Sequence, residues 1–64
     1  MDIEVFKKAL REALIRNEDT ARDYQEQASF CTDPAYKQEL LGKVAGLLEA
    51  NTNIRRAMVS LGGK

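Results

Sequence analysis

Histidine and tryptophan are absent from this 64-residue sequence, and cysteine and proline occur once each, as Cys31 and Pro34. Without histidine, a single thiol cannot complete a structural zinc site, and one cysteine cannot form a disulfide framework. A chain of this length buries only about 60% of its unfolded surface, so it is marginally stable alone. We therefore expect self-association to stabilise it.

An excess of charge of either sign is also lacking, because ten basic and ten acidic residues give a formal net charge of zero. Nucleic-acid-binding proteins usually carry a basic stripe, and Arg55-Arg56 is better explained as favourable charge near a helix C-terminus. No apolar run approaches the length of a membrane span, and the N-terminus lacks a signal peptide's apolar core. We predict a soluble, cytoplasmic protein that binds neither nucleic acid nor membrane and needs no cofactor.

Helical periodicity dominates the N-terminal half of the chain. Asp2 is placed to cap a helix, and strand signals such as alternating β-branched runs are missing. Steps of three and four residues align one stripe on a helix face. Its members are Ile3, Phe6, Leu10, Leu14, Asn17, Ala21, Tyr24, Ala28 and Cys31.

The C-terminal half repeats this pattern after Asp33-Pro34. Pro34 suits the first position of a helix, with Asp33 or Thr32 as its cap, and Gly62-Gly63 suits a helix C-terminus. The second stripe comprises Tyr36, Leu40, Val44, Leu47, Leu48, Asn51, Ile54, Met58 and Leu61.

These patterns predict an all-α fold with a single domain over residues 1–64. We expect one helix over about 2–31, a turn at 31–34 and a second helix over about 34–61. So short a connection makes the helices antiparallel. Two such hairpins would form a homodimeric four-helix bundle, or more copies a larger helical oligomer.

The second helix has features of a partner interface. Residues 2–26 include twelve charged side chains, whereas residues 40–54 include only Lys43 and Glu49. Such a low charge predicts that several sides of the second helix are covered, which places it at the centre of an assembly. Small residues would permit close helix approach on the face opposite the bulky stripe. The predicted interface residues are Gly42, Gly46, Ala50, Asn53 and Ala57; the alternative is a bland exposed surface.

Two asparagines interrupt the apolar stripes, and a polar residue in a helical seam commonly fixes register. In an antiparallel hairpin Asn17 lies opposite Leu48 and Asn51 opposite Leu14, so the amides can share hydrogen bonds within the pair or across a dimer. The alternative is that either amide turns to water.

Cys31 lacks a basic neighbour, so it is predicted to be a buried structural cysteine. Tyr24 and Tyr36 are predicted to be core aromatics.

The sequence resembles one helical hairpin of the ferritin-like, rubrerythrin-type superfamily. The likeness rests on Glu18-x-x-Ala21-Arg22-x-Tyr24, Ala28-Ser29, Asp33-Pro34-x-x-Lys37 and Val44-Ala45. It implies a four-helix bundle around a di-iron centre, with Glu18 as one ligand and Glu49 and Thr52 near the Glu-x-x-His position. The histidine is missing and Glu49 is expected to face away from the seam, so the resemblance implies a degenerate carboxylate site at most.

A second resemblance is to small helical-hairpin proteins of type III secretion systems, needle subunits and their co-chaperones. It rests on the length, the Thr32-Asp33-Pro34 turn and the tyrosine and leucine positions after it. We predict a structural or partner-binding role without catalysis or metal, in a homo-oligomer or with a partner helix. The alternatives are a ferritin-like carboxylate protein and a secretion co-chaperone or subunit.

Overall fold

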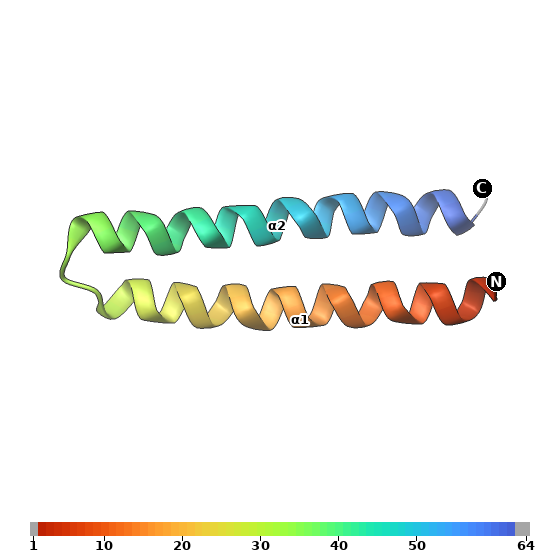
Figure 1. Ribbon diagram of the computed structural model, residues 1–64, viewed down its shortest axis with the longest axis horizontal. Coiled ribbons are helices and arrows are strands. Elements are labelled where there is room, and N and C mark those ends of the chain that lie inside the picture. The colour runs from red at the N-terminus through yellow and green to blue at the C-terminus, as the bar shows by residue number, and fades with distance from the viewer. Residues whose placement is uncertain (1, 63–64) are drawn as a thin grey trace.

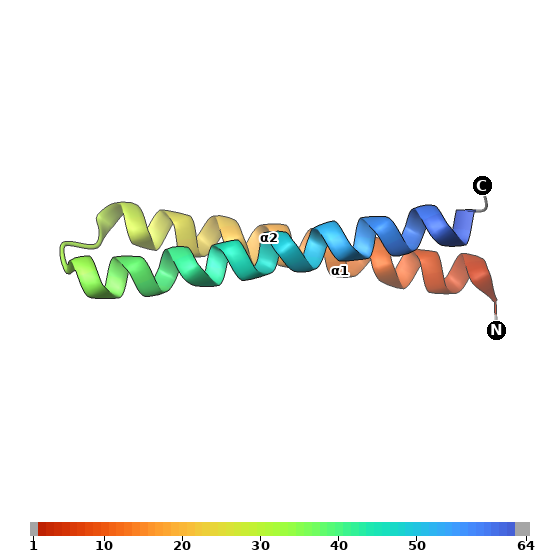
Figure 2. The ribbon, with the colours of Figure 1, turned by 90° about the horizontal axis from the view of Figure 1, so that it is seen from above.

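Two long helices lying side by side make up the computed structural model, which describes residues 2–62 (Figure 1). Helix α1 spans Ile3–Phe30 and helix α2 spans Pro34–Gly62, and residues 31–33 join them. The helices run antiparallel and cross at a shallow angle when seen from above (Figure 2). The hairpin measures 47 × 15 × 14 Å. The predicted all-α helical hairpin is therefore confirmed.

Side chains at the helix ends explain where the helices begin. The Asp2 carboxylate accepts a hydrogen bond from the Glu4 N–H at 2.9 Å, which caps α1 as predicted. At the turn, the Asp33 carboxylate accepts from the Ala35 N–H at 3.1 Å, so Asp33 rather than Thr32 caps α2. Pro34 then occupies the first helical position, where its missing N–H costs nothing.

The observed bounds differ slightly from the expected ones. Helix α1 starts at Ile3 and ends at Phe30, one residue inside each predicted limit, because Asp2 and Cys31 are its two caps. Helix α2 continues through Gly62, one residue beyond the predicted end. The prediction of a C-cap at Gly62-Gly63 involves Gly63, which lies outside the described residues.

A narrow seam between the helices forms the core. Its buried residues, all from the predicted stripes, are Ala21, Ala28, Leu40, Val44 and Asn51. The two alanines of α1 offer little bulk, so the larger α2 side chains can fit against them. Burial follows the three- and four-residue spacing because only one face of each helix meets the other.

Several predicted seam residues are exposed. Ile3 and Phe6 lie at the open end of the hairpin and Tyr36 beside the turn, where no third element covers them; Tyr36 is 47% exposed, so it is not a core aromatic. Leu48 is also 47% exposed. It follows Leu47 in the sequence, and one helical step turns it about 100° away from the seam.

Neither helix combines the length and apolar character needed to cross a membrane, within the residues that the structure describes.

Candidate functional site

The centre of the seam contains a polar contact between the two predicted asparagines, Asn17 and Asn51. The Asn17 amide nitrogen donates to the Asn51 amide oxygen at 2.9 Å, and the Asn51 nitrogen donates to the Leu14 carbonyl at 3.2 Å. Asn51 is only 1% exposed, whereas Asn17 is partly exposed. The structure thus brings the two amides together within one hairpin, as the antiparallel geometry allowed.

These two hydrogen bonds give the buried Asn51 amide partners for both its oxygen and its nitrogen. Over the described part of the chain, no buried side-chain nitrogen or oxygen lacks a partner. Sliding one helix by a single residue would separate the amides and leave Asn51 in an apolar seam. The two amides can therefore fix the register of α1 against α2, and neither amide is a nucleophile or a general base.

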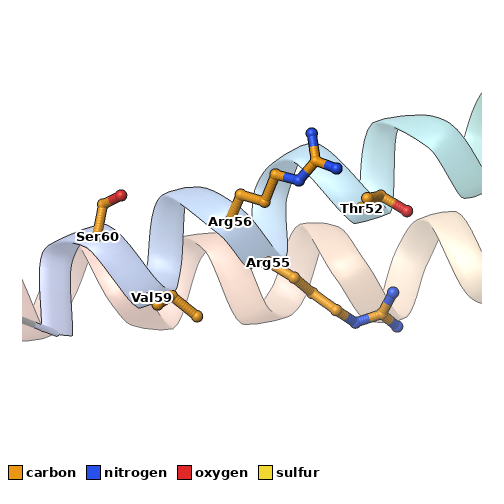
Figure 3. Close-up of a pocket in the computed structure, with 5 residues that line it drawn as sticks. All are labelled: Thr52, Arg55, Arg56, Val59 and Ser60. Carbon is orange, nitrogen blue, oxygen red and sulfur yellow. The ribbon is translucent and has the colours of Figure 1, made fainter. Parts of the chain in front are cut away.

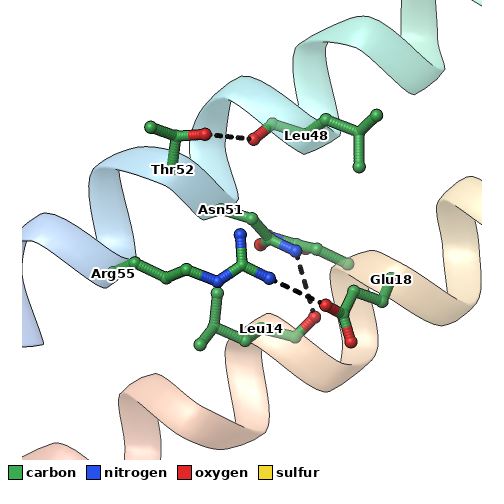
Figure 4. Close-up of polar contacts among 7 residues, drawn as sticks. Leu14, Glu18, Leu48, Asn51, Thr52 and Arg55 are labelled. Carbon is green, nitrogen blue, oxygen red and sulfur yellow. Dashed lines mark hydrogen bonds and ion pairs between the residues drawn. The ribbon is translucent and has the colours of Figure 1, made fainter.

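Glu18, the first residue of the implied carboxylate site, forms an ion pair across the hairpin. The Arg55 guanidinium lies 2.9 Å from its carboxylate, and both side chains are about half exposed (Figure 4). Sequence reasoning assigned Arg55 to the helix C-terminus and missed this pair, because the two positions are not directly opposite. Two long side chains reach each other diagonally along the helices.

Glu49, the second residue of that implied site, is exposed on α2. The expectation that it faces away from the seam is met. Residues 2–62 contain no cluster of three or more cysteine, aspartate or glutamate side chains that could hold a metal ion. Thr52 lies near the position expected for the histidine of the Glu-x-x-His motif. Its hydroxyl donates to the Leu48 carbonyl of the same helix at 3.1 Å.

The predicted small-residue interface is open in the isolated hairpin. Its members Gly42, Gly46, Asn53 and Ala57 are exposed, and Ala50 is partly exposed. Apart from its chain neighbours and the adjacent backbone of α2, a Cβ added at either glycine would meet no heavy atom within 4 Å. The two glycines are therefore not required by packing inside this chain.

Gly46 also borders a groove between the helices, together with Thr20, Tyr24, Lys43 and Leu47. The Lys43 ammonium lies 5.4 Å from the centre of the Tyr24 ring, within the range of a cation–π contact. This contact covers part of Tyr24, which is half-buried as a seam aromatic. The groove is lined mainly by apolar atoms and one ammonium group, without a set of converging polar groups.

A second apolar stripe runs along α2 on a face that α1 does not cover. Leu41 is 39% exposed, Leu48 47% and Val59 75%. Ala45 and Thr52 are exposed between them. These positions follow five residues on the seam side of α2 by one residue each: the buried Leu40, Val44 and Asn51 and the partly buried Leu47 and Met58. Sequence reasoning placed Leu48 in the first stripe and so missed the second, although the repeat of apolar pairs at 40–41 and 47–48 was the available signal.

Cys31 lies at the turn and is partly exposed rather than buried, contrary to the prediction. Its thiol donates to the Asp33 carbonyl at 3.4 Å. The backbone leaves the helix at this residue, so the side chain sits at the edge of the seam instead of within it.

Comparison with known proteins adds no relative: no protein-family model, curated protein or solved structure matches this chain.

Proposed function

We propose that this chain is a self-associating helical hairpin with a structural, assembly-forming role and no catalytic activity. A homodimer that forms a four-helix bundle is the simplest assembly. Helix α2 lies at its centre and α1 lies on its outside. In larger oligomers, or in a complex with a partner helix, α2 is likewise covered by helices of other chains.

The observation that carries this proposal is how little apolar surface one hairpin covers. Within residues 2–62, four apolar side chains and Asn51 are buried, while nine large hydrophobic side chains are more than a third exposed. Ordering each residue costs about 1–2 kcal/mol of backbone conformational entropy. A seam of this size is too small to offset that cost over sixty residues, and covering the remaining apolar surface with another copy supplies the difference.

The placement of α2 at the centre rests on where charge is missing. Its middle section carries only Lys43 and Glu49, whereas α1 displays charged residues along its outer faces, including ion pairs of Glu4 with Lys7 and Asp19 with Arg22. A helix that contacts only its hairpin mate gains solubility from charge on its far side. The face comprising Gly42, Gly46, Ala50, Asn53 and Ala57 remains our sequence-based proposal for a partner interface.

Sedimentation equilibrium across a range from about 1 to 100 µM tests the proposal, with circular dichroism recorded on the same samples. We expect a dimer or larger species at the upper concentrations and a thermal midpoint that rises with concentration. A monomer throughout, with a sharp transition independent of dilution, would refute self-association as the basis of stability.

A further inference from the structure

We propose that the second apolar stripe of α2, defined as Leu41, Ala45, Leu48, Thr52 and Val59, is the contact with a second copy of the chain, and that two α2 helices pack there antiparallel. This inference rests on the proposed self-association and names its surface. It differs from the small-residue face predicted from the sequence.

The spacing of the stripe is that of a helix–helix seam. Successive members are four, three, four and seven residues apart, which continues an alternating three- and four-residue repeat through position 55. The stripe follows the buried seam by one residue, so it is turned about 100° from α1. Two contact stripes about a quarter-turn apart allow α2 to pack against α1 and against the second copy at the same time.

Arg55 is the position that would place a charge in this stripe, and the structure shows why it does not interrupt the contact. Its guanidinium is directed toward α1 and bound by Glu18 at 2.9 Å. The surface between Thr52 and Val59 is left as a shallow hollow bordered by Arg55, Arg56 and Ser60 (Figure 3). Four residues at i, i+3, i+4 and i+7, here 52, 55, 56 and 59, are the set that receives a side chain from a facing helix.

An antiparallel register follows from the stripe itself. Placing Leu41 opposite the partner's Val59 also places Leu48 opposite the partner's Thr52 and Ala45 opposite the partner's Arg55, because each pair is centred on the same point of α2. Both leucines then meet a side chain of moderate size, and Ala45 lies over the hollow. The pairing is symmetric, so each contact occurs twice.

Charge complementarity supports the same arrangement. Glu49 and Arg56 are exposed on one flank of the stripe, seven residues apart, and neither has a charged residue three or four positions away on α2. In the antiparallel register Glu49 lies about 7.5 Å along the axis from the partner's Arg56, and the two side chains lean toward each other because helical side chains lean toward their own N-terminus. The partner's Glu49 lies about 3 Å away along the axis, but the two Glu49 side chains lean apart, toward opposite ends of the pair. A parallel pair would instead set Glu49 and Arg56 against the flank positions 44, 51 and 58, which are uncharged.

The area of α1 that lies beside this stripe offers no competing seam. Among the exposed large hydrophobic residues of α1, Ile3 and Phe6 are three residues apart at the end of the helix, but Val5, Ile15 and Phe30 do not extend that spacing into a stripe. The side of α1 next to Arg55 carries Glu18 and Arg22. The second copy is therefore expected to contact α2 first, with both α1 helices outside.

Charge reversal tests the register. The variants are Glu49→Arg, Arg56→Glu and the double variant, with the equally charge-changing Asp23→Arg on α1 as a matched control. Each single reversal makes two attractive pairs repulsive, so we expect the dimer dissociation constant from sedimentation to rise about tenfold at low salt. The double variant should return to within about threefold of wild type. Glu49 and Arg56 of one helix lie about 10.5 Å apart along its axis, so recovery cannot come from a contact within the chain.

A second variant, Leu48→Glu, tests the stripe independently of the ion pairs. Leu48 is half exposed and lies outside the seam of the hairpin, so the change should abolish dimerisation without disturbing that seam. Helicity should fall together with the dimer, because the isolated hairpin is marginally stable. A wild-type monomer would refute the proposed self-association and this inference together. A wild-type dimer unaffected by Leu48→Glu and the single reversals would refute only this surface. Single reversals that weaken the dimer without recovery in the double variant would refute the antiparallel register.

Discussion

The asparagine pair makes an asymmetric prediction, because Asn51 is almost fully buried and Asn17 is not. Leucine has nearly the shape of asparagine and lacks the amide, so Asn→Leu removes hydrogen bonding with little change in volume. In Asn17→Leu, the buried Asn51 oxygen loses the amide that donates to it at 2.9 Å. In Asn51→Leu, the remaining Asn17 amide can turn toward water at the edge of the seam.

The expected magnitudes follow from this difference. A buried polar atom left without a partner costs about 1–3 kcal/mol, whereas replacing both partners by apolar groups of similar shape is close to neutral or stabilising. Leucine also gains about 0.4 kcal/mol in helix propensity at each site. We expect Asn17→Leu to lower the free energy of unfolding by about 1–2 kcal/mol, Asn51→Leu to change it by less than about 1 kcal/mol, and the double variant to be the most stable of the three.

Wild type, the two single variants and the double variant form a double-mutant cycle. Urea unfolding at one fixed protein concentration, followed by circular dichroism, measures the free energy of unfolding of all four proteins. The coupling free energy between the two sites should be about 1 kcal/mol or more. Equal destabilisation by the two single changes, or a double variant that is simply the sum of the singles, would show that the hydrogen bond does not join the helices in solution. The wild-type seam should also be better ordered than the all-leucine one, because the amides specify a single register.

Three further predictions concern the caps, the small-residue face and the carboxylates. Asp33→Ala should lower the free energy of unfolding in urea by about 1 kcal/mol, because α2 loses the side chain that binds its Ala35 N–H. Asp33→Asn should keep most of this stability, because asparagine can also cap a helix. Gly46→Leu should raise the thermal midpoint and leave the dimer intact, since a Cβ there meets open space and the proposed seam lies on another face; a weaker dimer would place the contact on the small-residue face instead. Glu18→Gln should lower the free energy of unfolding by less than about 1 kcal/mol because the ion pair is half exposed, and elemental analysis of purified protein should find no stoichiometric iron, manganese or zinc.

Much of the fold was predictable because two local signals agree along the chain. The three- and four-residue periodicity identifies the face of each helix that is buried, and Asp33-Pro34 identifies the single break. In a hairpin with a three-residue connection these two facts also set which residues are opposite each other. That is why the approach of Asn51 to Leu14 and Asn17 followed from position in the sequence alone.

Other features depend on details that periodicity does not contain. The sequence shows that Leu47 and Leu48 are both apolar, but which of them lies in the seam depends on the rotation of α2 about its axis. Arg55 reaches Glu18 because of rotamer choice and side-chain length, which spacing does not describe. The exposure of Tyr36 and Phe6 arises because the ends of a two-helix seam have no further element to close them.

Cys31 chemically distinguishes the turn end of the hairpin from its open end. This is the only thiol in the chain, it is partly exposed, and it lies at the turn, at one end of a rod 47 Å long. A maleimide-linked spin label or fluorophore attached there marks the turn end and leaves both faces of α2 unmodified. In a parallel pair of hairpins two such labels would be neighbours, and in an antiparallel pair they would be separated by about the length of a helix. A single distance measurement on labelled wild-type protein thus reports the relative orientation of two copies without any substitution.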